Sequence, residues 1–164
     1  MPPYRALVVL GLVLAPTLQA QTSRADSLRA RHASVTGGVG NSYAGLGASV
    51  EAFLVRSRVS AFGTLGYVPR VNDTDGRTAA GAGMRAYSGG VRHRVYLEGA
   101  FAPLIADERL ASAPIPYGPA LAVGYSYTAA SGFTLTLSRG IGWAGSRHRL
   151  VAVGNFGLGY TWHR

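Results

Sequence analysis

The stretch LVAVGNFGLGYTW, residues 150–162, decides the fold of this chain. Its side chains divide between two faces with a period of two, which is the period of a β-strand. One face begins with Leu150 and becomes aromatic toward the chain end, at Tyr160 and Trp162. A tilted strand needs about 9–11 residues to cross a bilayer, and lipid-facing strands have aromatic residues at the membrane–water interface. The stretch therefore predicts a membrane-spanning strand.

Seven earlier segments alternate in a similar way. The eight predicted strands are residues 34–40, 46–55, 59–68, 78–87, 91–102, 117–128, 133–139 and 150–162. Short turns follow the second, fourth and sixth strands, at residues 56–58, 88–90 and 129–132, and longer loops follow the others, at residues 41–45, 69–77, 103–116 and 140–149. This alternation and an even strand number are typical of transmembrane β-barrels. We therefore predict an all-β fold, an eight-stranded antiparallel up-and-down transmembrane β-barrel over residues 34–162.

The end of the last strand also contains a short motif. In Asn155-Phe-Gly157-Leu-Gly-Tyr160-Thr-Trp162, a polar residue is followed at fixed spacing by Gly and then by two aromatic residues. The motif resembles the C-terminal signal of bacterial outer-membrane β-barrels, which the barrel-assembly machinery reads. Over residues 34–162 the chain resembles the small eight-stranded members of that class, without a subfamily motif. The resemblance implies residence in the outer membrane of a Gram-negative-type bacterium and assembly by that machinery.

The N-terminal region predicts export. Residues 1–20 have the features of a cleaved signal peptide, because Arg5 precedes an apolar run that is too short to span a bilayer as a helix. We expect residues 21–33 to form a periplasmic segment before the barrel. The formal net charge is +9 at pH 7 and no Cys is present. In an exported chain, this charge favours outer-membrane lipid and lipopolysaccharide, and not nucleic acid, as partners.

Four charged residues are predicted to form an ion network inside the barrel. Glu51, Arg85, Arg94 and Glu98 lie on the less apolar faces of their strands, and we expect all mid-strand charges to follow this rule. An Arg at mid-depth on the lipid face would cost about 2–4 kcal/mol. An eight-stranded barrel is too narrow for bulk water, so the charges must pair. We expect Arg85 to pair with Glu51 or Glu98, and Arg94 to lie nearer the periplasmic end.

The predicted outer loops suggest contacts with lipopolysaccharide. Arginine offers bidentate hydrogen bonds to phosphate. The residues expected to make such contacts are Arg70, Arg77, Arg147 and Arg149. No metal and no cofactor is expected, because the Asp-rich run at residues 72–76 lacks the later Glu of a calcium loop.

The same loops contain the residue types of a hydrolytic site. Ser146 and His148 could serve as nucleophile and base, with Asp107 or Glu108 as the orienting acid. Ser and His two positions apart are common by chance, so we do not expect an enzyme.

The sequence thus favours a monomeric outer-membrane barrel with a structural or interaction role, whose interior is plugged by the network of charged side chains. Three alternatives remain open. The first is a lipid A acyltransferase or deacylase that uses the loop Ser and His residues. The second is a minor channel for small solutes. The third is a soluble periplasmic lipid-binding barrel, which would have its apolar face inward and its charges outward.

Overall fold

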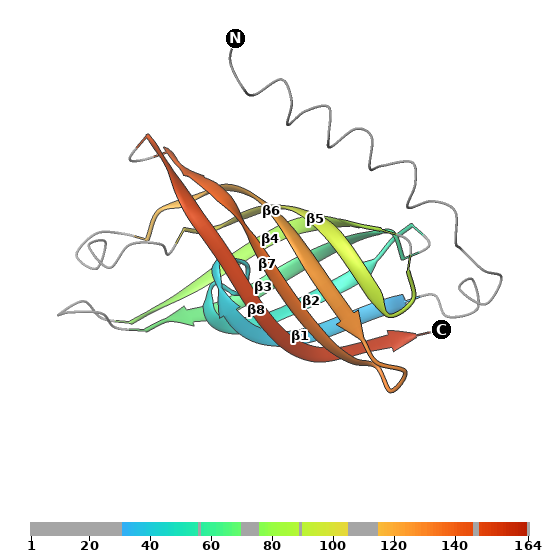
Figure 1. Cartoon of the computed structure of the whole chain (residues 1–164). Coiled ribbons are helices and arrows are strands. Elements are labelled where there is room, and N and C mark those ends of the chain that lie inside the picture. Colours follow the sequence, from blue (N-terminus) through green and yellow to red (C-terminus); the bar gives the residue numbers. More distant parts are fainter. Residues whose placement is uncertain are drawn as a thin grey trace, which may run out of the picture.

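A computed structural model describes residues 31–55, 57–69, 76–88, 90–104, 115–145 and 148–163. Within these ranges the chain forms eight strands and one 3₁₀ helix, η3 (Asn41–Tyr43). The strands are β1 Arg31–Gly40, β2 Gly45–Phe53, β3 Val59–Val68, β4 Arg77–Tyr87, β5 His93–Pro103, β6 Tyr117–Thr128, β7 Phe133–Ala144 and β8 Arg149–His163. Each strand pairs antiparallel with the next, and β1 pairs with β8, so the sheet closes (Figure 1). The prediction of an eight-stranded antiparallel up-and-down barrel is confirmed.

The two ends of the barrel differ in their connections. We call the end where β1 begins and β8 ends the turn end (Figure 1). It also has the connections at residues 54–58, 88–92 and 129–132. The opposite end, which we call the loop end, has the connections at residues 41–44, 69–76, 104–116 and 145–148. Longer connections therefore occur at the loop end only after β3 and β5, and the predicted alternation of lengths holds in part.

The seventh strand is longer than predicted. Residues 140–149 were expected to be the loop before the last strand, but β7 continues to Ala144. The period of two also continues, with Ile141 and Trp143 exposed on the outer face. These two residues are paired with Leu121 of β6 and Leu150 of β8, so the extension is part of the sheet on both sides.

The remaining strand limits differ from the prediction by a few residues, and β3 and β6 agree with it. β1 begins at Arg31, before the predicted start, because Arg31 pairs with His163 of β8. Of the expected periplasmic segment, residues 31–33 therefore belong to the barrel. Residues 1–20, the expected signal peptide, and residues 21–30 lie outside the described residues. Among the described residues, none forms a helix with the length and apolar character to cross a bilayer.

The side chains are distributed in the opposite way to a soluble protein. Large apolar residues cover the outer wall on all eight strands, and Leu65 is 66% exposed there. The inner wall is lined mainly by Ser, Thr and charged residues, among which Glu98 is 1% exposed. The predicted faces of the second, fourth and fifth strands are confirmed, because Glu51, Arg85, Arg94 and Glu98 are all buried. A soluble lipid-binding barrel would have the reverse distribution.

Arg139 is an exception to the predicted rule for charges. It was expected to end the seventh strand, but it lies near the middle of β7. Its side chain is exposed on the outer wall, between its Cα partners Val123 and Gly154. The prediction that every mid-strand charge faces inward is therefore wrong for this residue, because the strand continues beyond it.

Candidate functional site

The centre of the barrel interior contains an ion network of Glu51 on β2, Arg85 on β4 and Glu98 on β5. Arg85 Nη1 lies 3.0 Å from Glu51 Oε2, and Arg85 Nε lies 2.8 Å from Glu98 Oε2. All three side chains are buried, so water does not screen the two pairs. The register aligns them, because Arg85 is the direct cross-strand partner of Glu98. The predicted network is confirmed for these residues.

Hydroxyl groups and aromatic rings complete the surroundings of the network. The guanidinium of Arg85 lies over the ring of Phe62, with 4.3 Å to the centroid, and 5.1 Å from the centroid of Tyr96. The carboxylate of Glu51 also accepts hydrogen bonds from the hydroxyl groups of Ser34, Ser60 and Tyr87. Carboxylates and guanidinium are thus satisfied without bulk water, which a stable buried network requires.

Arg94 lies nearer the turn end and contacts the turns there. Its Nε donates to the carbonyl of Gly90 at 2.5 Å, and its Nη1 donates to that of Ser57 at 2.6 Å. Arg31 lies at the same end, where its Nη2 donates to the carbonyl of Val91 at 3.0 Å. These two buried arginines therefore fill the interior at the turn end. Sequence reasoning missed Arg31, because it was assigned to the segment before the barrel.

The first connection folds into the barrel. Residues 41–44, which we call the plug segment, were predicted to be an outer loop, but all four are buried and Tyr43 is 1% exposed. Gly40, with φ 123°, and Ala44, with φ 53°, bracket η3. A positive φ at both ends turns the chain sharply, so the segment reverses into the interior and not out over the rim.

Polar contacts fix the plug segment to the inner wall. The backbone N–H of Ser42 donates to Asn155 Oδ1 at 2.6 Å, and the Ser42 hydroxyl donates to Glu98. The Asn41 amide donates to the carbonyl of Pro103 at 3.0 Å. The Tyr43 hydroxyl is within hydrogen-bond distance of two threonines, at 3.1 Å from Thr36 and 2.9 Å from Thr136. The plug segment is therefore joined directly to the central ion network.

Glycine on the inner wall provides the space for the plug segment. A Cβ atom at Gly38 would lie 2.8 Å from Cε2 of Tyr43, and a Cβ atom at Gly157 would overlap the Tyr43 hydroxyl. Contacts below 3.0 Å essentially never occur for real Cβ atoms. A larger residue at Gly157 would force the Tyr43 ring to move, and one at Gly38 would also clash with the backbone oxygen of Phe156.

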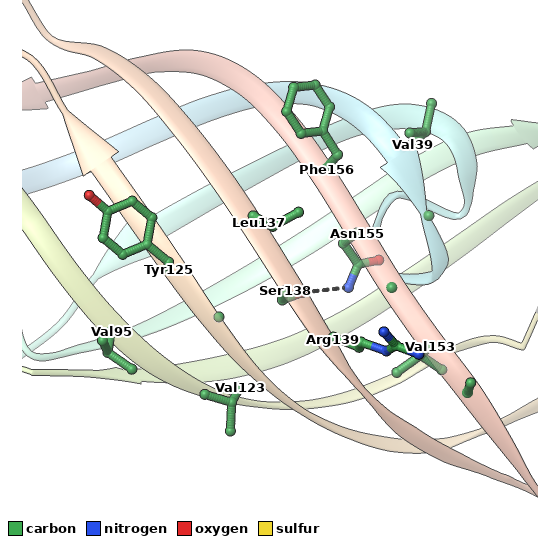
Figure 2. Close-up of a pocket in the computed structure, with 14 residues that line it drawn as sticks. Val39, Val95, Val123, Tyr125, Leu137, Ser138, Arg139, Val153, Asn155 and Phe156 are labelled. Carbon is green, nitrogen blue, oxygen red and sulfur yellow. Dashed lines mark hydrogen bonds between the residues drawn. The ribbon is translucent and has the colours of Figure 1, made fainter.

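Two residues of the predicted assembly signal also serve this interior. Asn155 accepts from Ser42 and donates through Nδ2 to Ser138 Oγ at 2.8 Å (Figure 2). Gly157 leaves room for Tyr43. The other two, Tyr160 and Trp162, are exposed on the outer wall with ring centroids 5.1 Å apart. The spacing of the motif thus places Asn155 and Gly157 on the inner wall and the two aromatic residues on the outer wall.

An apolar cluster fills the interior at the loop end. Leu104, which directly follows β5, is 0% exposed there. It packs with Ala122, Ala144, Val151 and Val153. The interior is thus occupied at both ends and at its centre by side chains.

The predicted loop residues are only partly described. Arg70, Asp107, Glu108, Ser146 and Arg147 lie outside the described residues. Among those that are described, Arg77 begins β4 and Arg149 begins β8, and both are exposed at the loop end. His148 lies beside Trp143, with ring centroids 6.3 Å apart.

The comparisons with known proteins leave the fold as the only basis for classification. No family model matches the chain, and no curated protein and no solved structure matches it either. In the part of the chain that the structure describes, no group of three or more His, Asp or Glu side chains is placed to hold a metal ion.

Proposed function

We propose that this chain is an integral outer-membrane β-barrel with a structural or interaction role. The observation that carries the proposal is the outer wall, where large apolar side chains are exposed on every strand while the ion network is inside. In water such a wall would be a very large exposed apolar surface, well beyond what soluble monomers tolerate. In a bilayer the same wall would contact hydrocarbon, and the closed sheet leaves no unpaired strand edge exposed to lipid.

Two groups of exposed aromatic residues support the proposal that the outer wall faces lipid. Those at the loop end are Tyr67, Phe101, Tyr117 and Trp143, and those at the turn end are Phe133, Tyr160 and Trp162. Phe101 and Tyr117 stack with their ring centroids 6.1 Å apart. Aromatic rings favour the two membrane–water interfaces, so these groups correspond to the two levels where the barrel leaves the hydrocarbon. The apolar strand centres lie between them.

The occupied interior favours an interaction role over transport. Eight-stranded barrels have interiors that side chains can fill, whereas aqueous channels need about 16 strands. Here the ion network, the plug segment, the apolar cluster and the two arginines at the turn end all occupy the interior. A channel would require breaking several of these contacts at once. We therefore propose a closed barrel that acts through its surface.

The proposed partner at the loop end is lipopolysaccharide. Arg77 and Arg149 are exposed at the strand ends there, close to the aromatic residues of the same end. Guanidinium groups at this level can bind the phosphates of a glycolipid by paired hydrogen bonds. We propose no catalytic role.

Membrane residence is tested by running the outer-membrane fraction on a denaturing gel, boiled and unboiled. We expect the protein in this fraction, with a faster or slower band before boiling, because the closed sheet resists detergent. A soluble periplasmic protein without a mobility shift would refute the proposal.

Lipopolysaccharide binding is tested with refolded barrel and purified lipopolysaccharide. The variant R77A/R149A should bind about tenfold or more weakly, since each phosphate contact contributes on the order of 1 kcal/mol. The matched control is R58A, because Arg58 is exposed at the turn end. Equal binding by all three proteins would exclude the proposed contact.

A further inference from the structure

Arg139 places a positive charge on an otherwise apolar part of the outer wall. Its outward neighbours on β7 are Leu137 and Ile141, and its Cα partners on the adjacent strands are Val123 and Gly154. Among the described residues, none forms a hydrogen bond or an ion pair with its guanidinium. In the proposed bilayer an unpaired charge at mid-strand is costly, and a lipid phosphate bound to the guanidinium would offset part of that cost.

The wall around Arg139 is shaped as an open groove. The groove has a volume of about 870 Å³, and residues of β5, β6, β7, β8 and β1 line it (Figure 2). Its apolar lining includes Val123, Leu137, Ala152 and Phe156. Gly154 leaves the floor open beside Arg139, because a Cβ atom there would have only the Ser138 carbonyl oxygen within 4 Å, at 3.8 Å. Figure 2 shows the Arg139 side chain extending from β7 toward β8.

The positive charge of Arg139 favours a negatively charged molecule as the ligand of the groove. A second copy of the chain would offer no carboxylate from its described outer wall, because Glu51 and Glu98 are both buried inside. The apolar lining favours hydrocarbon, and the guanidinium favours phosphate. An anionic membrane lipid combines these two groups in one molecule.

The depth of Arg139 suits a lipid of the leaflet at the loop end. Trp143 lies four positions further along β7 on the same face, at the level of the aromatic residues of that end. Four residues of a strand span about 13 Å along its axis, and less along the membrane normal because the strand is tilted. An Arg side chain can extend toward the interface while its stem stays in hydrocarbon. The guanidinium can therefore reach the level of a lipid phosphate.

We propose that this groove binds an anionic membrane lipid, with its phosphate on Arg139 and an acyl chain along Val123, Leu137 and Phe156. This inference rests on the proposed residence of the barrel in a membrane. It is separate from the lipopolysaccharide contacts at Arg77 and Arg149, which lie at the strand ends.

The two tryptophans allow a direct test. Trp143 lies near the groove and Trp162 lies at the turn end, so the W162F variant reports on the groove and the W143F variant is the matched control. Each is refolded into phosphatidylcholine vesicles that contain brominated phosphatidylglycerol or brominated phosphatidylcholine, and quenching of the remaining tryptophan is measured. We expect W162F to prefer the anionic lipid about fivefold, as one arginine–phosphate contact would give. W143F should show no preference.

The variant W162F/R139M assigns the preference to the guanidinium, since Met keeps an unbranched apolar side chain. We expect the preference to fall to about one. If the preference persists in this variant, or if W162F shows none while both lipids quench its fluorescence, the lipid site at Arg139 is wrong. If neither brominated lipid quenches either tryptophan, the barrel is not in the bilayer, and the proposed function fails together with this inference.

Discussion

At the scale of single residues, the stability of the ion network inside the barrel depends on Arg85. This guanidinium is the shared partner of two buried carboxylates, Glu51 and Glu98. Removal of the cation leaves two negative charges close together in a region that water does not reach. Breaking a buried pair in this way typically costs about 3–5 kcal/mol.

We therefore predict that R85M lowers the free energy of unfolding by about 3–5 kcal/mol, measured by urea unfolding of the refolded barrel in vesicles. The control R58M, at an exposed turn position, should change it by no more than about 0.5 kcal/mol. The triple variant E51Q/R85M/E98Q should recover part of the loss, because no unpaired charge remains. A triple variant less stable than R85M would show that the charges themselves are not the cause.

Gly157 provides a second test at this scale. A Cβ atom here would overlap the Tyr43 hydroxyl, so we predict that G157A destabilises the barrel by about 1–3 kcal/mol through overpacking. In the Y43A background the Tyr43 hydroxyl is absent. Adding G157A to Y43A should therefore lower the free energy of unfolding less than adding G157A to the wild-type barrel. The matched control on the same strand is G154A, where the outer wall is open. Equal losses for G157A and G154A in unfolding by urea would contradict this account.

At the scale of elements, the connection between β1 and β2 is the plug segment, which is buried inside the barrel and not exposed at its rim. Sequence reasoning assigned residues 41–45 to an outer loop, because they connect two segments of alternating side chains and do not continue the alternation themselves. The signal lies elsewhere in the sequence, in Gly38, Asn155 and Gly157, which leave the space and supply the acceptor. These residues are far apart along the chain, and only the closed sheet brings them together.

The plug segment predicts a local effect of N155A. Loss of the Asn155 side chain leaves the buried N–H of Ser42 without its acceptor, which costs about 1–3 kcal/mol. We expect hydrogen exchange of the Ser42 amide to become about tenfold faster or more in N155A. The amides of β4 should exchange as before, because that strand keeps its pairing with β3 and β5. Uniform acceleration over the whole barrel would instead indicate global destabilisation.

At the scale of the whole molecule, the strand number and the side-chain faces could be predicted from the sequence. The period of two is dictated by the pleat, and mid-strand charges such as Glu98 select the inner face. The length of β7 could not be predicted, because Gly140 and Gly142 resemble a loop until their pairing with β6 and β8 is known. The outward position of Arg139 was missed for the same reason.

The central claim is that the apolar outer wall faces lipid, and nitroxide accessibility tests it most directly. The chain has no Cys, so single-Cys variants can be labelled without background. We choose outward mid-strand positions, V50C, L97C and L158C, with R58C at an exposed turn as the control. In vesicles we predict that the outward labels collide more with molecular oxygen, which dissolves in hydrocarbon, than with a water-soluble nickel chelate, while the label at position 58 shows the reverse. Outward labels that collide mainly with the chelate would contradict the account.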